Sequence, residues 1–492
     1  MKKSSRGVWE LELFWLLMGR VAEIMGGALL IPVADGLFWH ETDIWVFLVP
    51  SVLAFALGGA FCYLGRHHMR QLNVWEGALF MVLVWPMLSV FGMMPYVLAD
   101  VIRDPLTALF ESVAAVTTTG ISCYTYTDFV MPHSLVLWHS LLNWLGGLNF
   151  ILILTTVLPQ VSGCFGLTLT ARQSIFFSPL WNKMASSAWQ GFRIYAVLTL
   201  LSFALFLLAG LMPFDAVTSA LVTLSSSGTA DPSLFMPYDL WPLELAAGIS
   251  MVLAALNPLL CWKSWQRRSI RLFLRDTEWQ VYLMILVAGG VLIALNLSRN
   301  GLCDGVTSLR YGFFQAASFL STCGFVSAPC WDWPPFSRLL LFIFVFIGGC
   351  IGSAGGGIKV IRFLVLLRMA LAEVRHTLHP HMVVSIKVDG LAVPAKVVGR
   401  ILSFFFLFIA IFALSALVIS LSGVSMMQAM GVAAGCLTSA GSTAALFGSG
   451  DFLWTPYWLK MFCAFLMVLG RIEIFSFFVL IDRGVRSFGK NW

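Results

Sequence analysis

The sequence predicts an all-α polytopic membrane protein, in which four span–pore-helix–span repeats surround a central pore and two further transmembrane helices precede them. Of the 492 residues, 59% are hydrophobic and only 11% are charged, about half the charged fraction of a soluble domain. Apolar runs long enough to cross a bilayer recur along the chain, without the period-two alternation of a transmembrane barrel. Between these runs, a cluster of small, mostly hydroxyl-bearing residues followed by glycine occurs four times.

These four clusters, which we call filter segments, each follow about a dozen helix-compatible residues. One copy would mean little, because hydroxyls before a glycine end many helices. Four copies in equivalent positions predict a pore built from four repeats. The filter segments are Thr117-Thr118-Thr119-Gly120, Ser225-Ser226-Ser227-Gly228, Ser321-Thr322-Cys323-Gly324 and Thr438-Ser439-Ala440-Gly441.

The chain divides in order into an N-terminal pair of transmembrane helices and four repeats. The pair, in residues 1–74, has spans at 8–33 and 44–64. Each repeat then has a span, a short re-entrant helix, a filter segment and a second span. The repeats are 75–160, 161–263, 264–372 and 373–492. The first spans of the four repeats are 75–99, 189–212, 278–297 and 396–421. Their short helices are 104–119, 214–227, 307–322 and 425–439. Their second spans are 134–159, 240–262, 336–370 and 455–482.

The short helices have start signals, namely Asp104 followed by Pro105, Asp215, and Ser or Thr near the other two starts. Each helix is expected to enter from outside and to end near mid-membrane. Four C-terminal partial charges then converge on the axis and favour a cation. The filter segments cannot continue as helix, and unpaired carbonyls at that depth are tolerable where they line an ion path.

Basic residues follow the membrane topology, so the net charge of +6 is not a nucleic-acid signal. They concentrate in segments 1–20, 65–74, 160–195, 263–276, 359–400 and 483–492, which places the N-terminus in the cytoplasm and the filter openings outside. No cysteine spacing suggests a metal site. Cys303 and Cys330 both fall in outer loops, and the sequence leaves open whether they pair.

Six glycines in ten residues, from Gly348 to Gly357, interrupt a long apolar run. They would cost a continuous helix several kcal/mol at roughly 1 kcal/mol each, so a broken helix is expected. A close-packing glycine face is the alternative. Arg471 lies within the last span, where an unpaired charge is expensive. We expect it to donate to carbonyls of the glycine loop, although a purely structural pair with an acid is the alternative.

The chain resembles the Trk/Ktr/HKT superfamily of potassium transport proteins, most closely the TrkH/TrkG branch, over nearly its whole length. The glycine run is the most specific of the matching motifs. These motifs are Thr117-Thr118-Thr119-Gly120, Leu141-Leu142-Asn143-Trp144-Leu145-Gly146-Gly147, the run from Gly348 to Lys359, His379-Pro380 with Ser385-Ile386-Lys387, and Gly470-Arg471-Ile472-Glu473.

The resemblance implies potassium uptake across the bacterial inner membrane, with K⁺ as the transported ion, no covalent cofactor and no enzymatic activity. It implies a homodimer in the lipid bilayer, regulated by a cytosolic TrkA-like ring that binds nucleotides, since this chain has no nucleotide-binding motif. Carbonyls at eight filter positions would face K⁺: Thr118, Thr119, Ser226, Ser227, Thr322, Cys323, Ser439 and Ala440. The expected gate comprises Gly348, Gly349, Gly352, Ser353, Gly355, Gly356, Gly357, Lys359 and Arg471.

Three filter segments depart from the family pattern. Thr229 follows Gly228 where an aromatic is usual, Cys323 replaces a threonine, and Ala440 and Ser442 flank the fourth glycine. Gly120 favours potassium, because plant relatives with serine there prefer sodium. A sodium-preferring or non-selective transporter of the same fold therefore stays open, as does a sensor that does not transport. An intramembrane enzyme is disfavoured, because no paired catalytic groups stand out.

Overall fold

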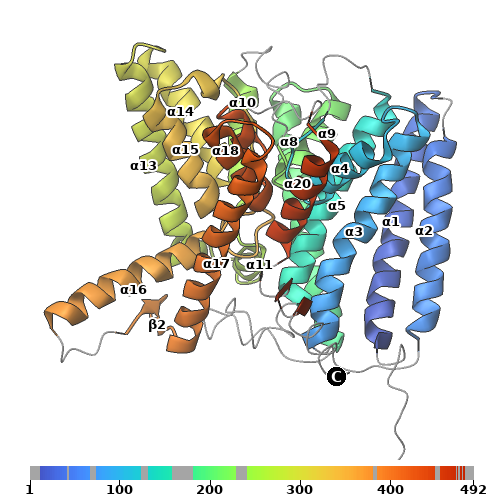
Figure 1. Cartoon of the computed structure of the whole chain (residues 1–492), viewed down its shortest axis with the longest axis horizontal. Helices are drawn as coiled ribbons and strands as arrows, with labels where there is room; N and C mark the ends of the chain where they lie inside the picture. The colour runs from blue at the N-terminus through green and yellow to red at the C-terminus, as the bar shows by residue number, and fades with distance from the viewer. Residues whose placement is uncertain are drawn as a thin grey trace, which may run out of the picture.

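Long apolar helices run side by side through the molecule (Figure 1). The computed structural model describes residues 11–41, 44–66, 74–123, 131–157, 181–228, 241–379, 385–448 and 455–472, with 474, 477–478 and 480–481. Within these residues, seven helices are long and apolar enough to cross a membrane. They are α1 (Glu12–Phe38), α2 (Trp45–Leu64), α3 (Val74–Leu98), α5 (His133–Leu152), α8 (Trp181–Leu208), α13 (Thr277–Arg299) and α17 (Ala395–Ser420).

Four short helices and the remaining elements complete the repeats. The predicted re-entrant helices are α4 (Pro105–Val116), α9 (Pro213–Leu224), α14 (Gly305–Leu320) and α18 (Met426–Thr438). The second spans are α5, continued by a π-helical turn (Ile153–Val157), α10 (Trp241–Ala254), α15 (Pro335–Ile347) and α20 (Tyr457–Arg471). The smaller elements are α11 (Pro258–Gln266), α12 (Arg271–Leu274), a 3-10 turn (Cys330–Asp332), α16 (Val360–Leu378), β1 (Lys387–Val388), β2 (Leu391–Ala392) and α19 (Ser442–Ala445).

The four repeats pack as a closed ring. Within each repeat, the first long helix packs on the short one: α3 on α4, α8 on α9, α13 on α14 and α17 on α18. The last helix of each repeat then contacts the short helix of the next: α5 contacts α9, α10 contacts α14, α15 contacts α18 and α20 contacts α4. The predicted fold class is therefore confirmed, with the four short helices enclosed at the centre.

The start signals of the short helices are largely as expected. The Asp104 carboxylate accepts from Thr107 N at 2.9 Å and so caps α4, while Ser425 and Gln428 form a capping box on α18. In contrast, α9 begins with Pro213, which leaves Asp215 within its first turn. Asp304, and not a serine or threonine, precedes α14.

Two predicted spans are wrong as continuous helices. The span expected at 240–262 bends by 90° between α10 and α11. The reason is Pro258, which disfavours helical backbone in the residue before it; Asn257 instead caps α11 by accepting from Leu259 N at 3.0 Å. The span expected at 455–482 is interrupted after Arg471, because Ile472 has extended backbone (φ −85°, ψ 94°); residues 474, 477–478 and 480–481 are again helical.

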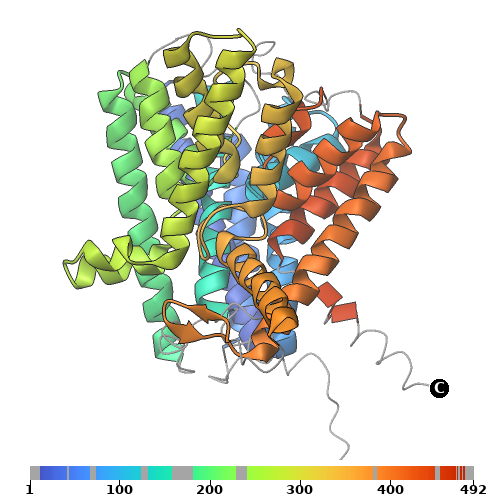
Figure 2. The same ribbon diagram turned by 90° about the vertical axis from the view of Figure 1, so that its left-hand side faces the viewer.

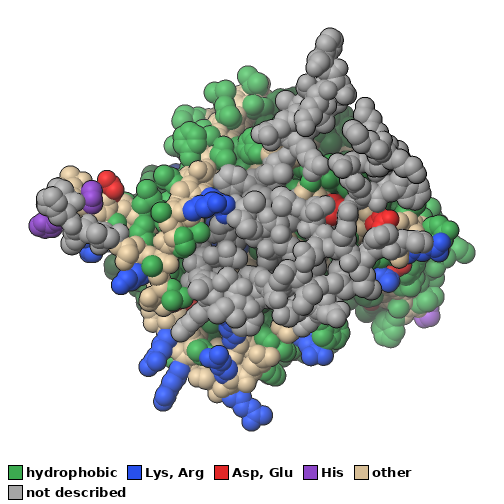
Figure 3. Space-filling model, turned by 90° about the horizontal axis from the view of Figure 1, so that it is seen from below, with side chains coloured by type: hydrophobic (Ala, Val, Ile, Leu, Met, Phe, Trp, Pro, Cys, Tyr) green, Lys and Arg blue, Asp and Glu red, His purple; other side chains and the backbone are tan. Residues whose placement is uncertain are grey.

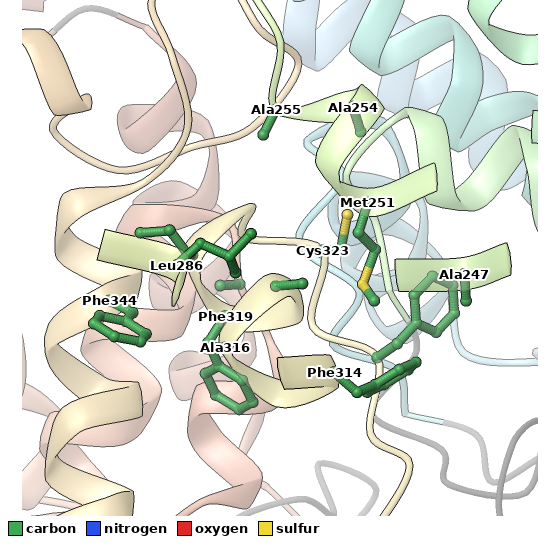
Figure 4. Close-up of a cluster of buried hydrophobic side chains, with 14 of the residues drawn as sticks. Ala247, Met251, Ala254, Ala255, Leu286, Phe314, Ala316, Phe319, Cys323 and Phe344 are labelled. Atoms are coloured by element: carbon green, nitrogen blue, oxygen red, sulfur yellow. The ribbon is translucent and has the colours of Figure 1, made fainter. Parts of the chain in front are cut away.

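Buried apolar side chains fill the spaces between neighbouring repeats. Figure 4 shows one such cluster, where Met251 of α10 and Leu286 of α13 surround Phe314 and Phe319 of α14. On the outside, large apolar side chains such as Leu200, Phe406 and Leu417 are exposed, as expected for helices that face lipid. Packing between repeats therefore holds the short helices in place.

Candidate functional site: filter ring and glycine loop

All four short helices end in the same backbone conformation. The second residue of each filter segment has a left-handed φ: 52° at Thr118, 58° at Ser226, 59° at Thr322 and 54° at Ser439. The amide of the third residue turns back to a carbonyl of the last helical turn, as in Thr119 N to Ala114 O at 2.8 Å. This is a Schellman-type helix end on a residue that carries a side chain, which costs roughly 1–2 kcal/mol per residue. Because this unfavourable conformation recurs in all four filter segments, we infer that the surrounding tertiary structure imposes it.

The four filter segments form a continuous ring. The glycines lie so close to their neighbours that a side chain would not fit. A Cβ atom placed on Gly120 would overlap Gly228 O, and one placed on Gly228 would overlap Cys323 O. Gly324 lies against Ser442, and Gly441 donates its N–H to Thr119 O at 2.7 Å, which joins the last repeat to the first. Glycine is therefore needed because the backbones approach each other too closely for a side chain.

The hydroxyls of the first two filter positions have different partners. At the first position, each hydroxyl bonds to its own helix: Thr117, Ser225, Ser321 and Thr438 donate to carbonyls three or four residues earlier. At the second position, Thr322 Oγ1 accepts from Gly356 N at 2.8 Å and Thr118 Oγ1 accepts from Arg471. Ser226 Oγ and Ser439 Oγ have no partner among the described residues. We call Thr118, Ser226, Thr322 and Ser439 the hydroxyl ring.

The glycine run breaks its helix, as predicted. Helix α15 ends at Gly348 (φ 72°), α16 starts after Lys359, and the loop between them returns on α15 through Ile358 N to Phe346 O at 2.9 Å. A Cβ on Gly348 would overlap Gly356 O, and one on Gly357 would lie 2.8 Å from Val345 O. These glycines allow the loop to fold tightly on its own helix.

The second half of the glycine loop lies against the hydroxyl ring. A Cβ on Gly355 would lie 2.7 Å from Ser321 O, and one on Gly356 would overlap Thr438 O. The first half contacts the bend of the second repeat instead, with Cys350 N donating to Ala255 O at 3.0 Å. Of the predicted gate glycines, Gly355 and Gly356 therefore contact the filter, whereas Gly348, Gly349 and Gly352 do not.

Two buried cations hold this arrangement. Arg471 donates to Thr117 O at 2.7 Å, to Ala354 O at 2.6 Å and to Thr118 Oγ1, so it joins the first filter segment to the loop. Lys359 donates to Gly355 O and lies 3.2 Å from Ser353 Oγ. The loop is also bound from the other side, where Glu278 of α13 accepts from Ile351 N at 2.7 Å.

Side chains behind the filter were not assigned a role from the sequence. Glu111 of α4 accepts from Cys123 N at 2.9 Å and Ser122 Oγ at 2.8 Å, and so fixes the backbone just beyond Gly120. Gln315 of α14 contacts Ser327 in the third repeat at 3.5 Å. Both residues lie nine positions before the glycine of their filter segment. Aligning the repeats on these glycines would have identified the two polar residues as equivalent.

A buried ion pair joins the second and third repeats. Arg310 of α14 donates to both carboxylate oxygens of Glu244 on α10, at 2.6 and 2.9 Å.

Among the described residues, no group of three or more acidic, cysteine or histidine side chains could hold a metal ion. The thiols of Cys303 and Cys330 are free. Thr229, Pro380 and Glu473, which the sequence motifs include, lie outside the described residues.

Comparison with known proteins agrees with this geometry. Residues 44–486 match the family model TrkH, described as cation transport protein. The Trk system potassium uptake protein TrkH of Halomonas elongata is 30% identical over 86% of this chain and 88% of its own. The Escherichia coli protein TrkG of the same description is 29% identical over 92% and 94%. The crystal structure of the potassium transporter TrkH from Vibrio parahaemolyticus superposes with a TM-score of 0.86 and 27% identity, covering 95% of this chain and 98% of that one.

Proposed function

Because this chain belongs to the TrkH family of cation transport proteins, we propose that it takes up potassium ions through the ring of four filter segments. The observation that carries the proposal is the closed ring itself, in which four helix ends of the same conformation meet and each filter segment contacts the next. Four helix C-termini bring partial negative charge to one point. Filter carbonyls beyond the hydroxyl ring can then replace water around a K⁺ ion.

The glycine loop is the gate in this proposal. It lies beneath the hydroxyl ring, and Arg471 and Lys359 add two positive charges at the same place. Both a steric block and repulsion of cations support a closed state. Opening requires the loop to leave the ring, which frees the hydroxyl of Thr322 to face the pore together with those of Ser226 and Ser439.

We infer that the end of the molecule bearing α11 and α16 faces the cytoplasm of a bacterial inner membrane, which also places the N-terminus there. Lys and Arg side chains gather around the rim of this face (Figure 3), consistent with the positive-inside rule. Helix α16 extends away from the bundle beside the β1–β2 hairpin (Figure 1). This exposed basic region is where a cytosolic nucleotide-binding ring would act, and we include a homodimer in the proposal.

A second candidate is a sodium-preferring or non-selective transporter of the same fold. One observation favours it: the filter glycines are not equivalent. Gly120 and Gly324 have φ of 72° and 84°, whereas Gly441 has φ −59° and Gly228 is not left-handed. The carbonyls of alternate repeats are therefore oriented differently, which lowers the symmetry of the ion site.

Rubidium flux into proteoliposomes tests both candidates, with sodium and lithium as competitors. Uptake that persists in excess sodium, and that loses this selectivity in Gly120→Ser, supports potassium transport. Gly59→Ser on α2 is the matched control, because a Cβ there meets nothing within 4 Å. Equal competition by sodium favours the second candidate, and absence of flux even with a cytosolic ring supplied contradicts both.

A further inference from the structure

An apolar groove runs along the outside of the second and third repeats. It has a volume of about 630 Å³ and lies between α10, α13 and α14, with Phe273 of α12 at one end. Its lining is apolar except for Glu244 and Arg310, which bind each other. Several lining side chains are exposed, including Trp241, Leu245 and Leu309, so the groove opens toward the bilayer.

Helices α11 and α12, at the end of the groove, resemble a segment that lies in a membrane interface. After the 90° bend they leave the bundle sideways (Figure 2). Trp265, Ile270 and Leu274 are large, apolar and exposed. Basic side chains alternate with them, the pattern of an interfacial amphipathic helix.

Four arginines near the groove are available to a ligand. Arg267, Arg268, Arg271 and Arg275 are exposed, and none forms an ion pair within the part of the chain that the structure describes. Phe273, whose ring lies 4.8 Å from that of Trp279 in the groove wall, stands between Arg271 and Arg275 in sequence. The four arginines therefore belong to the same short segment as Phe273, which lines one end of the groove.

We propose that this groove binds an acidic phospholipid, with the phosphate on the arginine cluster and one acyl chain along α10. The charge of the cluster selects an anionic headgroup over a zwitterionic one. The lining residues of α10 run from Trp241 to Leu253, about 18 Å at 1.5 Å per residue. An acyl chain spans about half of a ~30 Å hydrocarbon core, so the groove is long enough. This proposed lipid site requires only that the protein lie in a bilayer. It does not depend on which ion the protein transports.

The bound lipid would contact elements that position the filter and gate. Phe314 and Ala317 of the lining belong to the third short helix. At the inner end, Leu256 of the lining is next to Ala255, whose carbonyl accepts from Cys350 of the glycine loop. The lipid is therefore expected to stabilise the third filter segment and the loop together.

Native mass spectrometry of the full chain, extracted from vesicles of phosphatidylglycerol and phosphatidylcholine, tests the proposal. Arg271→Gln with Arg275→Gln should weaken phosphatidylglycerol retention about thirtyfold, at about 1 kcal/mol for each basic residue. The matched control is Arg375→Gln with Lys396→Gln, which removes two exposed charges elsewhere and should retain the lipid.

A second variant fills the groove without removing charge. Gly248 lines the groove, and a Cβ there meets nothing within 4 Å, so Gly248→Phe should fold and expel the acyl chain. Gly59→Phe, equally open on α2, should leave retention unchanged. Equal retention of phosphatidylcholine, or undiminished retention in both groove variants, would overturn the proposal. So would loss of a dimer in Gly248→Phe without loss of lipid, which would assign the groove to a second copy of the chain.

Discussion

Arg471 is the residue on which the proposed closed state depends most directly. It is buried, and its guanidinium donates to both the first filter segment and the glycine loop. Among the described residues, it forms no ion pair with an acid; its bonds are to carbonyls and to a threonine. Opening the loop breaks the bond to Ala354, so the same side chain can stabilise one state without fixing the other.

We predict that Arg471→Ala raises basal rubidium flux at least tenfold in proteoliposomes without any cytosolic partner. A hydrogen bond to a charged group contributes about 1.5–3 kcal/mol, and each 1.4 kcal/mol is a factor of ten in the closed–open equilibrium. Arg299→Ala, at the exposed end of α13, should leave flux unchanged. A folded Arg471→Ala protein with flux at or below the original level would contradict the gating role.

Glu111 allows a separate test of the filter. Glu111→Ala removes the carboxylate that accepts from Cys123 N and Ser122 Oγ. Loss of a hydrogen bond to a charged group costs about 1.5–3 kcal/mol and loosens the backbone beyond Gly120. We expect sodium to compete better with rubidium in this variant. Glu111→Gln keeps one acceptor oxygen and should have intermediate selectivity. Unchanged competition in Glu111→Ala would show that the contact does not support selectivity.

At the scale of elements, the glycine loop combines two requirements that can be separated. Gly352 needs its left-handed backbone (φ 79°) but has room for a side chain, whereas Gly356 lies directly against Thr438 O. The loop thus combines left-handed backbone, which glycine adopts without strain, with close contact against the filter. In the proposed gate, only the contact with the filter would close the pore.

We predict that Gly356→Ala raises basal flux at least tenfold, because the added Cβ overlaps Thr438 O and prevents the loop from seating. Gly352→Ala should cost about 1 kcal/mol of backbone strain and leave basal flux within about twofold. The same proteoliposome assay measures both. If the two variants behave alike, strain in the loop and not contact with the filter controls opening.

The elements were largely predictable, for reasons that differ between them. Long apolar runs predicted the spans, and Asp104 followed by Pro105 predicted the start of the first short helix. Both signals depend only on neighbouring residues in the sequence. The break at Gly348 was also local. The bend at Asn257-Pro258 was missed because the surrounding run stays apolar, although the proline was the signal for it.

The filter was predictable in position but not in conformation. The left-handed residue of each helix end was not predicted, because left-handed backbone favours glycine and here falls on Thr118 and its equivalents, two positions before the glycine. What imposes it is the ring of neighbours, which no single repeat encodes. The contact of Glu111 with Cys123, and the pair formed by Glu244 and Arg310, likewise depend on three-dimensional packing.

At the scale of the whole molecule, the ring depends on contacts between repeats, and the Glu244–Arg310 pair is one that can be measured. Removing one partner of a buried pair leaves an uncompensated charge, typically at a cost of 3–5 kcal/mol, while replacing both with apolar groups is often nearly neutral. We expect Glu244→Leu and Arg310→Met each to lower the thermal midpoint, and the double variant to be more stable than either. Additive losses in this cycle would show that the pair does not act as a unit.

The seam of the ring has a consequence for biosynthesis. Gly441 in the last repeat bonds to Thr119 in the first, and α20 packs on α4. A ribosome-bound chain that has inserted three repeats therefore lacks the fourth side of the ring of filter segments. The wall of the proposed ion path is completed only when translation has reached the final helices, and the loop of the third repeat, the proposed gate, is already made by then.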